Sequence, residues 1–67
     1  MISAAKIESI LSEKGMTWYQ LGQKSGVSRD VIYLIKSKRK KNTTLKTTMA
    51  VAKVLGVSVA DIIEEEG

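Results

Sequence analysis

The fold is predicted from the pattern in MTWYQLGQKSGVSRDVIYLI, residues 16–35. Thr17 and Ser28 are of the types that cap helix N-termini, and each has an apolar residue before it and another four positions after it, as in a hydrophobic staple. Gln20 completes a capping box with Thr17. Gly26 lies between the two caps, where a residue without a Cβ lets the chain reverse at positive φ. This pattern predicts a helix-turn-helix over about residues 17–36, with helices at about 18–25 and 29–36.

The rest of the chain repeats these signals. Ser3 and Ser58 have the same apolar flanks, and Gly15 and Gly56 follow helical stretches, where a left-handed residue ends a helix. Apolar residues recur at helical spacing, and strand-like alternation is absent. We therefore expect three further helices, at about 4–14, 45–55 and 59–64. The predicted fold is all-α, a compact five-helix bundle in which residues 1–67 form a single helix-turn-helix domain.

The helical spacing also predicts the core. The residues expected to face inward are Ile7, Ile10, Leu11, Leu21, Val27, Ile32, Ile35, Leu45, Met49, Ala52, Leu55 and Ile62. Gly22 lies inside a helix, where it costs about 0.5–1 kcal/mol relative to Ala, so we expect helix 29–36 to approach closely there. Four more apolar residues exceed what a small core requires and are predicted to serve association between copies, unless they are ordinary surface: Val51, Val54, Val59 and Ile63.

The composition excludes several classes of function. The chain contains no Cys and no His, which excludes disulfides and the usual zinc sites, so we expect no metal and no cofactor. No paired acids or phosphate-cradling glycine loop suggest catalysis, and the chain is not expected to be an enzyme. The apolar runs are too short to cross a membrane, and the N-terminus lacks the layout of a signal peptide. We expect no membrane partner and a location in the cytoplasm of a cell or of an infected host.

Positive charge is concentrated in the middle of the chain. Residues 24–46 carry eight basic side chains and one acidic one, whereas the remainder has a net charge of −3. Five of these cations fall within residues 36–41. Such asymmetry is typical of a surface that binds a polyanion, although a charged run can also be a solvated face.

Residues 16–35, followed by LKTTMAVAKVLGVSVADII at 45–63, resemble the Xre-type helix-turn-helix family of phage Cro and lambda-type repressors. The positions that carry the resemblance are Thr17, Leu21, Gly26, Val27, Ser28, Ile32, Ile35, Leu45, Ala52, Leu55, Gly56 and Val57. The resemblance implies a sequence-specific transcriptional regulator, a repressor, that inserts helix 29–36 in the DNA major groove. It also implies a homodimer on a near-palindromic double-stranded operator. No small-molecule effector is expected, since so short a chain has no room for a domain to bind one.

The exposed face of helix 29–36 is where base recognition is expected, mainly at its N-terminal residues. The predicted base-reading residues are Ser28, Arg29, Asp30, Tyr33 and Leu34. Arg29 fits O6 and N7 of guanine, with a phosphate contact as the alternative. Asp30 would accept from cytosine N4 or simply complement the helix dipole. Ser28 is first a cap, and Tyr33 can also donate to a phosphate. Leu34 and Val31 can touch thymine methyl groups, with core packing as the alternative for Val31.

A second set of residues is expected on the DNA backbone. Its members are Thr17, Trp18, Lys36, Lys38, Arg39, Lys40, Lys41 and Asn42. Trp18 begins helix 18–25, where this family commonly has a phosphate-clamping Gln. Free backbone N–H groups there suit a phosphate, and the indole N–H adds a donor, while partial burial in the core is the alternative. The basic residues would supply affinity and orientation without reading sequence.

Two other functions fit the same fold. A protein-interaction or RNA-binding adaptor would reuse it, but RNA recognition usually brings exposed stacking aromatics, and only Trp18, Tyr19 and Tyr33 are available. An antitoxin-type regulator would bind DNA and a toxin protein together. Enrichment of one DNA sequence from a random pool distinguishes a regulator from an adaptor.

Overall fold

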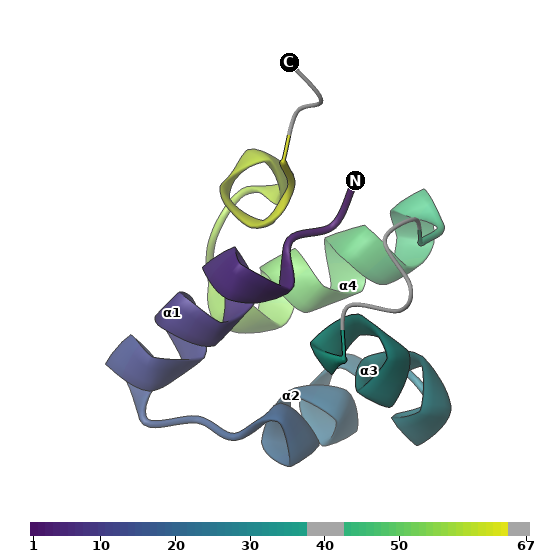
Figure 1. The fold of residues 1–67 in the computed structure, drawn as a ribbon, viewed down its shortest axis with the longest axis horizontal. Helices are drawn as coiled ribbons and strands as arrows, with labels where there is room; N and C mark the ends of the chain where they lie inside the picture. Colours follow the sequence, from purple (N-terminus) through teal and green to yellow (C-terminus); the bar gives the residue numbers. More distant parts are fainter. Residues whose placement is uncertain (38–42, 65–67) are drawn as a thin grey trace.

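The computed structural model describes residues 1–37 and 43–64, which contain four α-helices and no β-strand (Figure 1). The helices are α1 (Ala4–Lys14), α2 (Trp18–Ser25), α3 (Arg29–Lys36) and α4 (Leu45–Leu55). These ranges agree with the prediction, and the all-α class is confirmed. Helix α2 contacts both α3 and α4, so the helix-turn-helix is joined to the rest of the domain mainly through α2.

The fifth predicted helix is shorter and of another type. Instead of an α-helix over about 59–64, the chain forms a single 3₁₀ turn, η1 (Val59–Ile62). It then pairs with the N-terminal segment through an isolated antiparallel bridge between Ile2 and Ile63. Ser3 N–H donates to Ile62 O and Glu64 N–H donates to Met1 O, both at 2.8 Å. Glu64 N–H would bond within a helix that reached residue 64, but it is used in this pairing instead, so the fifth α-helix is not confirmed.

Side-chain caps begin all four α-helices. The hydroxyls of Ser3, Thr17, Ser28 and Thr44 each accept a backbone N–H three residues later. At α2 the predicted capping box is complete, since Thr17 Oγ1 accepts from Gln20 N–H and Gln20 Oε1 accepts from Thr17 N–H, both at 3.0 Å. A cap of this kind is worth about 1 kcal/mol, a large amount for a domain of this size. The helix starts are therefore specified locally.

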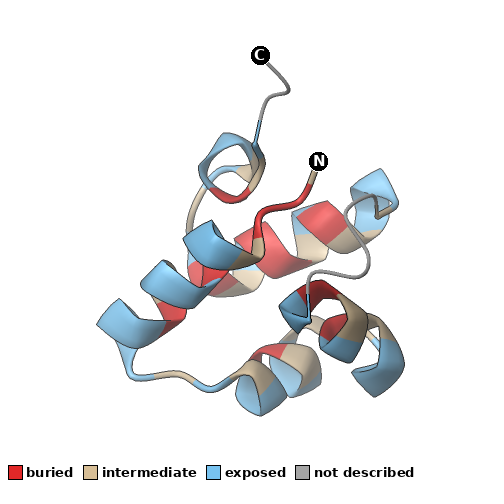
Figure 2. Ribbon diagram, in the orientation of Figure 1, coloured by how far each residue is buried: buried red, intermediate tan, exposed pale blue. Residues whose placement is uncertain are grey.

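The core lies where the four helices and η1 meet, and each of these elements contributes buried residues to it (Figure 2). Most of the predicted core is confirmed, namely Ile7, Leu11, Leu21, Ile32, Ile35, Ala52, Leu55 and Ile62. Ile10 and Val27 are half-buried and pack against it. Ile2 was not predicted to be in the core and is buried there because the bridge to Ile63 draws the N-terminal segment inward.

Helix α4 is rotated relative to the prediction. Leu45 and Met49 were expected to face inward, but they are 68% and 54% exposed. The buried face of α4 consists of Thr48, Val51, Ala52 and Leu55. Thr48 is tolerated there because its hydroxyl donates to Thr44 O at 3.1 Å and lies 2.7 Å from Thr43 Oγ1.

The predicted association surface is also wrong in part. Val51 is fully buried in the core and is unavailable to a second copy. Val54, Val59 and Ile63 are half-buried and pack against the same core. The large apolar side chains that are exposed in the described C-terminal half are those of Leu45 and Met49.

Candidate nucleic-acid interface

The turn between α2 and α3 brings the two helices into close contact. Gly26 ends α2 with a φ of 74°, in the left-handed region that favours glycine. Val27 N–H donates to Ser25 Oγ at 3.3 Å, and Val27 packs against the core. A Cβ on Gly22 would lie 3.3 Å from Ile32 Cγ1, which confirms the expected close approach of α3. The contacts of Val27 and Ile32 thus fix the helix-turn-helix through its buried side and leave the outer face of α3 exposed.

The faces of α3 separate as predicted. Ile32 and Ile35 are buried, while Ser28, Arg29, Asp30 and Tyr33 are exposed. Val31 is half-buried and packs against the core, so the packing alternative holds for it. Leu34 is also half-buried and lies between the two faces. The exposed side chains of the first turn of α3 are therefore polar, and the core holds the helix that carries them in place.

The first turn of α3 offers both donors and acceptors to a ligand. Ser28 Oγ accepts from Val31 N–H at 3.3 Å, which uses the oxygen as a cap and leaves the hydroxyl hydrogen free to donate. Asp30 lies in the first helical turn, where a carboxylate complements the helix dipole. Arg29 is the first residue of the helix and is exposed, so its guanidinium adds a charged donor at the same end.

The N-terminus of α2 is the second predicted contact point. Thr17 is exposed, and its hydroxyl hydrogen is not used by the capping box. Trp18 is half-buried and packs against the core, so the core alternative holds in part. The unpaired N–H groups of the first helical turn remain suited to a phosphate.

The predicted phosphate-binding residues are only partly within the described structure. Lys36 is exposed at the last turn of α3. Lys38, Arg39, Lys40, Lys41 and Asn42 lie outside the described residues. The chain is described again from Thr43, whose hydroxyl meets Thr48 at the start of α4. The basic segment therefore begins where α3 ends and precedes the cap of α4.

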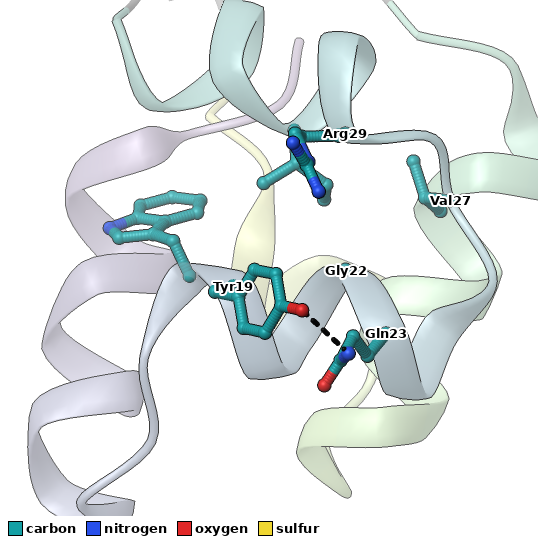
Figure 3. A pocket seen from close by; sticks show the side chains of 7 residues that line it. Tyr19, Gly22, Gln23, Val27 and Arg29 are labelled. Atoms are coloured by element: carbon teal, nitrogen blue, oxygen red, sulfur yellow. Dashed lines mark hydrogen bonds between the residues drawn. The ribbon is translucent and has the colours of Figure 1, made fainter.

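A cleft of about 190 Å³ lies between α2 and α3 (Figure 3). Its lining comes from both helices and the turn: Trp18, Tyr19, Gly22, Gln23, Val27, Arg29 and Ile32. Gln23 Nε2 donates to Tyr19 Oη at 2.9 Å across one turn of α2 (Figure 3). Tyr19 and Gln23 were not among the predicted site residues. Their spacing of four on a helix was the available signal, because side chains so spaced are neighbours.

A comparison with models of protein families identifies the family to which this helix-turn-helix belongs. The family model described as a Cro/C1-type HTH DNA-binding domain matches residues 6–66. The chain belongs to the Cro/C1-type helix-turn-helix family. Comparisons with curated proteins and with solved structures gave no significant match. Members of this family are DNA-binding regulators, so the exposed face of α3 belongs to a DNA-binding domain.

Two further features of the described residues concern alternative functions. None of their helices combines the length and the apolar character needed to span a membrane. Among the same residues, no group of three or more His, Cys, Asp or Glu side chains is arranged to hold a metal ion.

Proposed function

We propose that this Cro/C1-type protein is a sequence-specific transcriptional repressor that inserts α3 in the major groove of double-stranded DNA. The proposal is based on the orientation of α3. Its inner face is buried through Ile32 and Ile35, while its N-terminal turn is exposed. A recognition helix meets base edges mainly with such N-terminal residues. The role places the protein where the DNA is, in the cytoplasm of a bacterium or a phage-infected host.

Base reading is assigned to the exposed face of α3. The proposed readers are Ser28, Arg29, Asp30, Tyr33 and Leu34. Arg29 is the leading one because its planar fork matches O6 and N7 of guanine, and a good bidentate pair discriminates by about 1–3 kcal/mol. Asp30 beside it would disfavour a phosphate at that place, which favours a base over the backbone as the partner of Arg29.

Phosphate binding is assigned to the residues that flank the recognition helix. Thr17 and Trp18 would bind one phosphate at the N-terminus of α2, through the hydroxyl and the free backbone N–H groups. Lys36, Lys38, Arg39, Lys40, Lys41 and Asn42 would lie along the backbone beyond the end of α3. About four to six neutralised phosphates would give a salt slope of about −0.9 per contact, since each contact releases counterions.

We further propose that two copies bind a near-palindromic operator. Two recognition helices related by a twofold axis would then be about 34 Å apart, one turn of DNA. Leu45 and Met49 support self-association, because they are exposed and lie four residues apart on α4. No small-molecule effector is included in the proposal, so control would come from the concentration of the protein or from a partner.

Selection of binding sites from a random duplex library tests the proposal. A sequence-specific regulator should enrich a near-palindrome and bind it about 10³-fold or more tightly than random DNA. The same titration at several salt concentrations should show the linear decline of log affinity with log salt. Tight binding without any enriched sequence would contradict the proposal and would favour a polyanion-binding adaptor.

A further inference from the structure

The cleft between α2 and α3 contains a tyrosine whose placement neither capping nor core packing explains. Tyr19 is 59% exposed, and its hydroxyl accepts a hydrogen bond from Gln23 Nε2 at 2.9 Å. Because the two residues are on the same helix, this bond restrains the tyrosine ring against the surface of α2. Arg29 lines the same cleft from α3. Figure 3 shows Arg29 on α3 and Tyr19 on α2, across the cleft from one another.

The Arg29 side chain is exposed, and an arginine that moves freely in solution loses much rotamer freedom when it binds DNA. An aromatic ring reduces that loss, because its face attracts a guanidinium group and favours the rotamers that lie over it. The ring does so more effectively when it is itself held in place, and the bond from Gln23 to Tyr19 Oη supplies that restraint. A restrained tyrosine that shares a cleft with an arginine is therefore suited to orient that arginine before binding.

We propose that Tyr19, braced by Gln23, is a positioning residue for Arg29. The tyrosine ring holds the guanidinium in the cleft in the orientation from which it meets a guanine edge. Tyr19 acts through Arg29 and itself needs no contact with a base. This inference rests on the proposed function, because it requires that Arg29 reads a base.

A double-mutant cycle on a selected DNA site tests the inference. The guanine read by Arg29 is identified first, as the one whose replacement by 7-deazaguanine, which lacks N7, weakens the wild type but not Arg29→Ala. Tyr19→Ala should then weaken binding to the intact site by about two- to fivefold, the usual strength of an exposed cation–π contact. In the Arg29→Ala background the same change should have no effect, because the group that it positions is gone.

Two further variants separate the ring from the hydroxyl. Tyr19→Phe keeps the ring but loses the bond from Gln23, so it should cost part of the guanine preference, less than Tyr19→Ala does. Gln23→Ala removes the brace and should give a smaller loss than Tyr19→Ala. Tyr19 is exposed and Ala is a better helix former than Tyr, so Tyr19→Ala should fold, and the melting temperature of each variant checks this.

The outcomes distinguish this inference from the proposed function. If Tyr19→Ala costs as much in the Arg29→Ala background as in the wild type, Tyr19 acts independently of Arg29 and the inference is wrong. If Tyr19→Phe weakens binding to all sequences as much as Tyr19→Ala does, the hydroxyl contacts a phosphate and the inference is again wrong. Either result leaves the selected site, and hence the proposed function, intact. Failure to enrich any site would overturn the proposed function and this inference with it.

Discussion

A Cβ added to Gly22 in α2 would lie 3.3 Å from Ile32 Cγ1 in α3, so the two helices meet so closely that even a methyl group there would require Ile32 to shift slightly. This contact sets how closely the recognition helix lies against α2. Ile32 also lines the cleft between the helices, so its side chain has open space on one side. The Ile32 side chain is therefore packed tightly against Gly22 but has room to shift into the cleft.

Gly22 substitutions should show this asymmetry. In Gly22→Ala the gain of about 0.5–1 kcal/mol in helix propensity opposes a small shift of Ile32 into the cleft, so stability should change by less than about 1 kcal/mol. Gly22→Val adds a branched side chain that Ile32 cannot avoid, and should destabilise by about 1–3 kcal/mol. Urea unfolding of both variants measures the difference. Equal stability of the two would show that α3 is not held at this contact.

The cap of α2 should contribute measurably to stability. Thr17→Ala removes the acceptor of Gln20 N–H and should lower the free energy of unfolding by about 1 kcal/mol. Thr17→Ser keeps a hydroxyl at the same place and should retain most of that stability. Thermal unfolding of the pair checks the prediction, which would fail if the Ala and Ser variants melted together.

Arg29 and Lys36 should affect DNA binding in different ways. Arg29→Ala should relax the preference at one base pair of the selected site by about 1–3 kcal/mol. Lys36→Gln should weaken all sequences alike and reduce the magnitude of the salt slope by about 0.9. Competition binding with single-base variants of the site, repeated over a range of salt, measures both effects. A uniform loss for Arg29→Ala would assign that residue to the phosphates instead.

Met49 should matter for self-association and not for folding. It is 54% exposed on α4, so Met49→Lys should leave the melting temperature nearly unchanged. A lysine at an apolar interface would be desolvated without a partner, and the dimer should weaken about tenfold or more. Sedimentation velocity over a range of protein concentrations measures this. Lys53→Gln, another exposed change on the same helix, is the control. Unchanged association in Met49→Lys would place the dimer interface elsewhere.

The four α-helices and the turn between α2 and α3 could be predicted from local signals in the sequence. The caps at Ser3, Thr17 and Ser28 bond to groups only three residues away. The left-handed residues, such as Gly26, are likewise fixed by the local backbone. Interactions of such short range can be found in a linear pattern, and the exposed first turn of α3 followed directly from them.

Other features depend on contacts between distant parts of the chain and could not be predicted in this way. The 3₁₀ turn at Val59–Ile62 replaced a longer helix because the residues after it pair with the N-terminal segment. Helical spacing placed Leu45 and Met49 on one stripe, but it could not say which neighbouring helix would cover that stripe, and none of the described ones does. The cleft that brings Tyr19 and Arg29 together likewise depends on how α2 and α3 pack. In each case the deciding contact is between residues on different elements, and periodicity within one element carries no information about it.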